Sequence, residues 1–172
     1  ITHTATSGYF AARPVSVAVT DNEVASVVIT ETGGSTAMTE GSTTGDSYTV
    51  ALGCQPPGNV TVTVTVSDGK TTVNGAASTT LVFDLTAWNT LKTVTVRAVD
   101  DAVIEGPHTG AVTHTATGGR FDAVSIRSVI VSITDNDFPG TPTSLTAATT
   151  SGGVHLGWVV PTGAIPGGYE VY

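Results

Sequence analysis

Alternation of apolar and polar residues is the strongest local pattern in this chain. The segment VTVTVTVS, residues 60–67, places four valines on one face and the intervening threonines on the other. A period of two predicts a half-buried β-strand. No long segment has the three-and-four spacing of an amphipathic helix, so we expect helix to be scarce. The predicted strands cover residues 26–30, 47–52, 60–67, 79–83, 92–99, 110–117 and 124–134.

Turn-forming residues separate these strands. Gly-Asp, Pro-Pro-Gly and Ser-Asp-Gly fall between them, and such residues favour the backbone angles of tight turns. Seven or so short strands at this spacing predict an all-β protein built as an immunoglobulin-like antiparallel β-sandwich. The composition agrees, because the β-branched residues Val and Thr are abundant and favour strands.

The chain also repeats part of itself. The segment ITHTATSGYFAA, which begins at Ile1, recurs as VTHTATGGRFDA, which begins at Val112, and the copies lead into VAVTDNE and VSITDND. The repeat unit of about 110 residues has the size of one sandwich. We therefore predict a closing hairpin of a preceding unit, or a complementing strand pair, in residues 1–22 and a complete unit in residues 23–137. The run PGTP after Phe138 begins something different in residues 138–172, so partial sandwich segments are expected at both ends.

Charge and cysteine content limit the partners. The net charge is -8 with only six Lys and Arg, which argues against nucleic acid and anionic membranes and is compatible with divalent cations. No apolar run is long enough to span a bilayer. Cys54 is the only cysteine, so it forms no intrachain disulfide and is expected to be a small packing residue. Asn59-Val60-Thr61 is an N-glycosylation sequon, which makes Asn59 a candidate glycan acceptor and favours the cell exterior.

The stretch AVDDAVIEGPHTG concentrates acidic residues that are otherwise sparse. Asp100, Asp101 and Glu105 repel one another unless a cation neutralises them or water screens them. His108 lies in the same loop and is able to reach a carboxylate. Catalysis is disfavoured, because adjacent carboxylates on a loop diverge and no nucleophile triad, phosphate loop or zinc motif is visible. We predict that the protein is not an enzyme, and the residues leave a metal site and a solvated turn open.

Packing is the predicted role of two other histidines and of a tryptophan. His114 shares a strand face with Val112 and Ala116, and His3 occupies the same position in the first copy. We expect both histidines to pack at the edge of a core with one hydrogen bond. Trp88 is predicted to close one end of the core rather than to bind a sugar.

These residues also resemble a known family. The run TVTVRAVDDAVIEGPHTGAVTHTATGG, followed by VIVSITDND, resembles a Calx-β domain of the tandem bacterial surface-protein type, and FDLTAWNTLKTVTV resembles the stretch that leads into the same strand. The resemblance covers residues 24–137, with residues 1–23 as the tail of a preceding copy. It implies a seven-stranded immunoglobulin-like sandwich and, in some members, a Ca²⁺ site at one end.

Carried over by position, the resemblance implies a set of calcium ligands. Ca²⁺ takes six to eight oxygen ligands from carboxylates and carbonyls, and the carbonyl of Val103 is a further candidate. Calcium-binding members place an Asp-Tyr just before the fourth strand, where this chain reads VNGAAST, which implies one bound ion at most. The implied ligands are Glu40, Asp100, Asp101, Glu105, Asp135 and Asp137.

The C-terminal segment resembles a second family. PGTPTSLTAATTSGGVHLGWVVPTGAIPGGYEVY resembles the first three strands of a fibronectin type III domain. The resemblance implies that Leu145 fills the first strand. The matching positions of the second and third strands are Leu156, Trp158, Pro161, Tyr169 and Tyr172.

Two functions fit this organisation. The first is a structural building block of an extracellular or cell-surface repeat protein, in which the N-terminal hairpin of one chain completes the C-terminal strands of the next. Such head-to-tail self-association makes a filament, and Ca²⁺ at the acidic end would stiffen the joint between units. Asp21 and Glu23 of TDNE are expected to have the same role at the joint between the preceding unit and the complete one. The alternative is a calcium-dependent adhesion or spacer module of a larger secreted or surface protein, next to neighbouring repeats.

Overall fold

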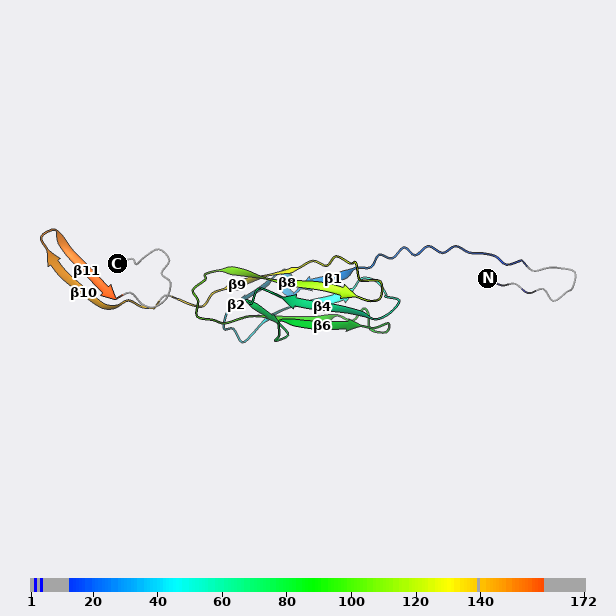
Figure 1. Ribbon diagram of the computed structural model, residues 1–172, viewed down its shortest axis with the longest axis horizontal. Helices are drawn as coiled ribbons and strands as arrows, with labels where there is room; N and C mark the ends of the chain where they lie inside the picture. The colour runs from blue at the N-terminus through cyan, green and yellow to red at the C-terminus, as the bar shows by residue number, and fades with distance from the viewer. Residues whose placement is uncertain (1, 3, 5–12, 139, 160–172) are drawn as a thin grey trace.

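The computed structural model describes residues 2, 4, 13–138 and 140–159. Two β-sheets pack face to face in its central part (Figure 1). The four-stranded sheet has the order β1 (Val27–Glu31), β3 (Asp46–Leu52), β7 (Lys92–Ala98) and β5 (Thr71–Val73). The five-stranded sheet has the order β2 (Thr36–Thr39), β9 (Val129–Thr134), β8 (His108–Thr117), β4 (Val60–Val66) and β6 (Ser78–Phe83). The predicted all-β sandwich is confirmed.

The buried faces of both sheets form one core. Val60, Val62 and Val64 of β4 are completely buried, and the threonines between them are partly exposed because β4 lies between β8 and β6. Tyr48 and Val50 of β3 are completely buried on the facing sheet. Burying a valine side chain contributes roughly 1.5 kcal/mol or more. The strictly alternating strand predicted from the sequence therefore supplies a central part of the core.

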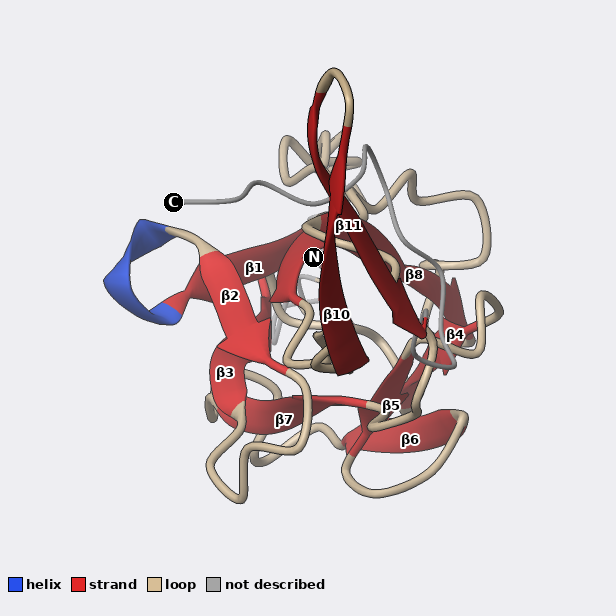
Figure 2. Cartoon of the chain, turned by 90° about the vertical axis from the view of Figure 1, so that its left-hand side faces the viewer, coloured by secondary structure: helices blue, strands red, loops and turns tan. Residues whose placement is uncertain are grey.

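The strand pattern differs from the prediction at three places. β2 and β5 were not predicted, and β2 pairs with β9 in parallel, so the sandwich is not antiparallel throughout. β9 begins at Val129, whereas the sequence predicted a strand from residue 124. The carbonyl of Arg127 instead accepts a hydrogen bond from Nδ1 of His114 (3.1 Å). At this position a side-chain hydrogen bond takes the place of backbone pairing between strands. The short 3-10 turn Thr32–Gly34 lies beside β2 in Figure 2.

His114 packs in the core, as predicted. Its side chain lies against Tyr48, whose hydroxyl donates a hydrogen bond to Nε2 of His114 (2.8 Å). Only 7% of His114 is exposed, and this burial lowers its pKa. Both ring nitrogens are satisfied, which excludes His114 from metal binding in this arrangement. His3, the other histidine of this type, lies outside the described residues.

The segments that flank the sandwich leave it at opposite ends (Figure 1). Residues 13–26 contain no strand, and most of residues 1–12 lie outside the described part, so the predicted N-terminal hairpin remains a prediction. β10 (Thr143–Thr150) and β11 (Gly153–Val159) form a separate antiparallel hairpin.

The hairpin has no core of its own within the described residues. Leu145 lies in β10, the first strand of the hairpin, and is 70% exposed because no second sheet covers it in the described residues. Leu156 and Trp158 are half-buried. The remaining positions matched to fibronectin type III, Pro161, Tyr169 and Tyr172, lie outside the described residues. The one helical element in the described part is the three-residue 3-10 turn, and no helix there is able to span a membrane.

Candidate metal centre

Three loops meet at the end of the sandwich where β2, β7 and β9 finish and β8 begins. We call this end the acidic pole. The parallel pairing of β2 with β9 is extended by one further bond, in which the backbone N–H of Glu40 donates to the carbonyl of Thr134 (3.0 Å). This bond places Glu40 beside Asp135. The acidic pole consists of Glu40, Asp100, Asp101, Glu105, His108, Asp135 and Asp137.

Glu40 is the most unusual residue of the pole. Its side chain is only 1% exposed, and neither of its carboxylate oxygens has a hydrogen-bond partner among the described residues. Burial raises the pKa of Glu40, His108 partly offsets the rise, and the carboxylates of Asp101, Asp135 and Glu105 raise it further. A buried carboxylate without partners is costly unless a cation or a proton neutralises it. Glu40 therefore needs a positive partner.

Asp135 organises the loops around Glu40. Its Oδ2 accepts hydrogen bonds from the backbone N–H groups of Glu105 (2.7 Å) and Gly106 (2.6 Å), and its Oδ1 accepts one from Asp137 (2.8 Å). These bonds, led by the one from Asp137, lower the pKa of Asp135. Asp135 thus remains ionised and ties the start of β8 to the end of β9.

Asp137 completes an all-oxygen group with Glu40 and Asp135. Ligand atoms of these three residues lie within 4.8 Å of one another. Oδ2 of Asp137 is buried and has no hydrogen-bond partner. Burial, followed by the charges of Asp135, Asp100 and Asp101, raises the pKa of Asp137. Bonds to Ca²⁺ are 2.3–2.6 Å, so two of its ligands lie at most about 5 Å apart, and this spacing is compatible with that ion.

A second group at the pole contains a histidine. Ligand atoms of Glu40, Glu105 and His108 also lie within 4.8 Å of one another, so His108 reaches carboxylates as predicted. Lys70, which the sequence did not single out, forms an ion pair with Oε1 of Glu105. That contact raises the pKa of Lys70. Lys70 lies 35 positions before Glu105 in the sequence, so no local sequence pattern predicts this ion pair.

The paired aspartates lie around these groups rather than within them. Oδ1 of Asp100 accepts a hydrogen bond from the side-chain amide of Asn136 (3.2 Å), and Oδ1 of Asp101 accepts one from the backbone N–H of Val103 (2.7 Å). Asp100 also lies against Gly41, where a Cβ atom would come within 2.8 Å of its Oδ1. In the described residues neither aspartate joins a three-ligand group. The charge of Asp101 raises the pKa of Glu40, and the charges of both aspartates raise the pKa of Asp137. Their role as ligands stays a prediction.

Unsatisfied polar atoms concentrate at this pole. Of the five buried side-chain polar atoms without a partner in the described residues, four belong to Glu40, His108 and Asp137. Native proteins satisfy nearly all such atoms with protein groups, water or ions. The donor set of carboxylates on loops suits a hard divalent cation such as Ca²⁺. The residues present therefore fit a bound cation.

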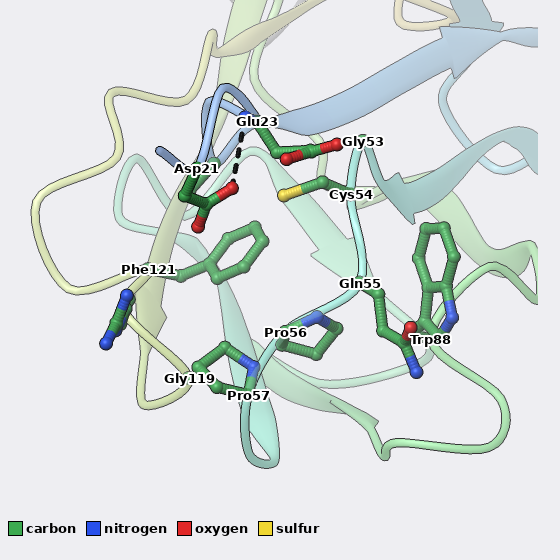
Figure 3. Close-up of a pocket in the computed structure, with 12 residues that line it drawn as sticks. Asp21, Glu23, Gly53, Cys54, Gln55, Pro56, Pro57, Trp88, Gly119 and Phe121 are labelled. Carbon is green, nitrogen blue, oxygen red and sulfur yellow. Dashed lines mark hydrogen bonds between the residues drawn. The ribbon is translucent and has the colours of Figure 1, made fainter. Parts of the chain in front are cut away.

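The opposite end of the sandwich carries a different feature. A depression of about 590 Å³ lies between residues 53–57, Trp88, Phe121 and the chain that enters the sandwich, as Figure 3 shows. Trp88 and Cys54 pack against the core there, as predicted, and also line the depression. Asp21 and Glu23 lie at its rim, and Oδ1 of Asp21 accepts a hydrogen bond from the backbone of Glu23 (3.3 Å).

The predicted second metal joint at this end is not assembled in the described residues. Asp21 and Glu23 belong to no group of three ligands there, and a role for them at a joint remains a prediction. Asn59 is exposed directly before β4. Its side chain is accessible to a glycan, although glycosylation itself remains a prediction.

No protein-family model and no curated protein matches the chain. Among solved structures, the chain is similar to the apo form of the Calx CBD1 domain, with a TM-score of 0.46 and 16% identity over 64% of this chain and 98% of that one. A two-domain protein of unknown function from Bacteroides fragilis has a TM-score of 0.44 and 9% identity, over 72% and 54%. CBD12 from CALX1.2 has a TM-score of 0.42 and 12% identity, over 78% and 72%.

Proposed function

We propose that this chain is a calcium-binding structural module of an extracellular or cell-surface repeat protein. Ca²⁺ binds at the acidic pole and stiffens the exit of the chain from the sandwich, a mechanical role rather than a catalytic one. The proposal joins the resemblance of residues 24–137 to Calx-β repeats with the chemistry of the pole. Its finer part, that the module belongs to the tandem bacterial surface type, rests on the sequence resemblance.

The observation that carries the proposal is the burial of Glu40 without a hydrogen bond from any described residue. Its side chain is 1% exposed and both oxygens lack hydrogen bonds. A carboxylate held in this way costs several kcal/mol unless it is neutralised. A cation that binds Glu40 in the folded protein would offset this cost, because a ligand that binds only the native state stabilises that state.

Glu40, Asp135 and Asp137 would hold the ion directly, with Asp100, Asp101 and Glu105 as further ligands or as nearby charge. When bound, Ca²⁺ supplies positive charge that links separate loops. Asp135 and Asp137 come directly after β9, and Phe138 follows them toward β10. Fixing these residues restricts the backbone between the sandwich and the hairpin.

Thermal unfolding of the full chain with Ca²⁺ and with a chelator tests the proposal. Ligand at about one hundred times its dissociation constant stabilises by about 2.7 kcal/mol, which raises Tm by about 10 °C for a domain of this size. Asp137→Asn is expected to remove most of this shift. Asp122→Asn serves as the matched control, because Asp122 lies at the other end of the sandwich, where it accepts a hydrogen bond from the backbone N–H of Gly118 (3.0 Å). A Tm indifferent to Ca²⁺ in the wild-type protein would make the pole a metal-free acidic turn.

A second candidate function, head-to-tail assembly, is favoured by the β10–β11 hairpin. All side chains of β10 are exposed, and the two strands pair only with each other in the described residues. A two-stranded ribbon is marginal in water, and its open edges are templates for another strand. We propose that these edges pair with a neighbouring repeat or a second copy of the chain.

Electron microscopy and size-exclusion chromatography separate this assembly from the adhesion or spacer alternative. Filaments or concentration-dependent oligomers support strand pairing between copies. A monomer at every concentration excludes self-assembly and leaves a spacer or adhesion module that responds to Ca²⁺. The calcium measurement above is independent of both outcomes, because it reports on the pole of a single sandwich.

A further inference from the structure

His108 is positioned to offer a lone pair to the inside of the acidic pole. It is the first residue of β8, and its Nδ1 lies 2.9 Å from the carbonyl oxygen of Gly106. A carbonyl oxygen only accepts, so Nδ1 carries the hydrogen of the neutral ring and Nε2 is left with a free lone pair. A backbone carbonyl that fixes the tautomer in this way is the usual partner of a metal-binding histidine.

Nε2 of His108 faces two carboxylate oxygens. It lies 3.5 Å from Oε1 of Glu40 and 3.5 Å from Oε2 of Glu105. Nε2 and both oxygens of Glu40 are buried and have no hydrogen-bond partner. The lone pair of Nε2 and the carboxylate oxygens Oε1 of Glu40 and Oε2 of Glu105 repel one another at these distances, so a positive charge among them would stabilise the arrangement.

The spacing suits a small divalent metal. Bonds of 2.0–2.2 Å in a tetrahedral zinc site separate neighbouring ligands by about 3.4 Å. The two distances from His108 are 3.5 Å, so a metal would need little movement of these side chains. Ca²⁺ takes oxygen ligands, whereas an imidazole nitrogen suits Zn²⁺ and related transition metals. The nitrogen therefore distinguishes this group from Glu40, Asp135 and Asp137.

Neighbouring groups hold the other ends of these ligands. Lys70 pairs with Oε1 of Glu105 and leaves Oε2 directed toward His108. Asp135 accepts the backbone N–H of Glu105 (2.7 Å) and fixes the loop that carries it. Contacts of this kind orient metal ligands and are a common part of metal sites. Glu105 is thus able to bind a metal with one oxygen while its other oxygen stays on Lys70.

We propose that Glu40, Glu105 and His108 form a second cation site, selective for Zn²⁺ or a similar transition metal, beside the all-oxygen group. The two sites share Glu40 and draw their remaining ligands from different loops. This site goes beyond the proposed calcium function and does not depend on it, because neither Asp135 nor Asp137 is among its ligands. The pole would then respond to two chemically different cations.

Titration calorimetry with Zn²⁺ on the metal-stripped full chain, prepared without a polyhistidine tag, tests the site. We expect one saturable Zn²⁺ site, and the visible absorption of bound Co²⁺ should report a nitrogen-containing ligand set. His108→Gln is expected to weaken Zn²⁺ binding at least tenfold, since losing even a supporting partner of a metal ligand costs about 10–100-fold. His155→Gln, a change in an exposed residue of β11, is the matched control and should leave binding unchanged.

Two variants keep this proposal apart from the calcium proposal. His108→Gln should lose Zn²⁺ binding and keep its thermal response to Ca²⁺, whereas Asp137→Asn should lose the response to Ca²⁺ and keep Zn²⁺ binding. An absence of saturable Zn²⁺ binding in the wild-type protein would overturn the proposal. Equal Zn²⁺ affinity in wild type and His108→Gln would also overturn the proposal. Metal-free melting curves of each variant confirm that the compared proteins are folded.

Discussion

Replacing Glu40 by glutamine should change the stability of this protein in opposite directions with and without Ca²⁺. Glutamine has nearly the same shape as glutamate and carries no charge. In the metal-free protein the buried charge of Glu40 is unfavourable, because burial and three neighbouring carboxylates raise its pKa and His108 offsets only part of that rise. In the calcium-bound protein the same charge is a ligand. Glu40→Gln should therefore stabilise the metal-free protein and abolish most of the stabilisation by Ca²⁺.

The size of the effect follows from the spacing of the charges. Ligand atoms of Glu40 lie within 4.8 Å of those of Glu105, Asp135 and Asp137. At that separation two like charges repel by about 3 kcal/mol for an effective dielectric constant of about 20, and solvent and salt reduce the value. Attraction to Lys70 and His108 offsets a further part. We expect Glu40→Gln to raise the metal-free free energy of unfolding by about 2 kcal/mol at neutral pH and low salt.

Chemical denaturation in chelator and in saturating Ca²⁺ measures the change in the free energy of unfolding that Glu40→Gln causes in each condition. Glu31→Gln is the matched control, because Glu31 is a largely buried glutamate whose carboxylate has partners. Its carboxylate pairs with Arg127 (2.8 Å) and accepts a bond from Thr36 (2.9 Å). Glu31→Gln should destabilise the protein in both conditions and leave the calcium response intact.

Two results would refute the reasoning. If Glu40→Gln lowers metal-free stability as Glu31→Gln does, then the charge of Glu40 is stabilised in solution by water or by neighbouring cationic groups. If Glu40→Gln retains the full response to Ca²⁺, then Glu40 is not a ligand and the aspartates of the pole hold the ion without it.

Three further predictions concern pH, a glycine and the core. A carboxyl whose pKa is raised by folding favours the folded state fully below its unfolded pKa and loses that contribution as pH rises through its folded pKa. In the metal-free protein, the difference in the free energy of unfolding between Glu40→Gln and wild type should therefore be small near about pH 4 and increase toward neutral pH. Denaturation at several pH values measures this difference, and a difference that is constant with pH would contradict the prediction. Gly41→Ala should destabilise by about 1–2 kcal/mol and weaken Ca²⁺ binding, because Gly41 has a φ of 65° and an added Cβ would meet Asp100, whereas Gly58→Ala, which meets nothing, should have little effect in the same melts. Tyr48→Phe should cost about 1–2 kcal/mol in denaturation, because it leaves Nε2 of buried His114 without its hydrogen bond; an unchanged midpoint would show that the bond contributes nothing net.

The sequence predicts the parts of the fold that depend on local periodicity. β4, β3 and β7 each begin and end within one residue of the prediction, because alternation of buried and exposed positions determines them. β2 and β5 were missed because each is four residues or fewer and carries no clear alternation. What defines β2 is its parallel pairing with β9, a contact that no local pattern encodes.

The candidate site was predictable in composition but not in arrangement. The paired acids Asp100 and Asp101 draw attention in the sequence, yet in the described residues they lie around the ligand groups. Glu40 is a lone glutamate in the segment MTEG, and nothing in that segment indicates that it is buried. The resemblance to a family placed it among the ligands, whereas its lack of partners became visible only in the folded chain. Lys70 was missed because its contact joins two loops that are distant in sequence.

Under the proposed function, the acids of the pole have different roles, and these roles would let the pole bind a cation without reorganising. Asp135 uses its oxygens to accept three backbone hydrogen bonds, and these bonds hold the loops together before any ion arrives. Glu40 and Asp137 keep buried oxygens free of such bonds. A site whose frame is already hydrogen-bonded loses little conformational freedom on binding, so more of the electrostatic gain is available as affinity. Because the frame includes the residues that leave β9, that gain also resists bending between the sandwich and the hairpin, and neutralising Asp135 should weaken the frame even where Glu40 and Asp137 are intact.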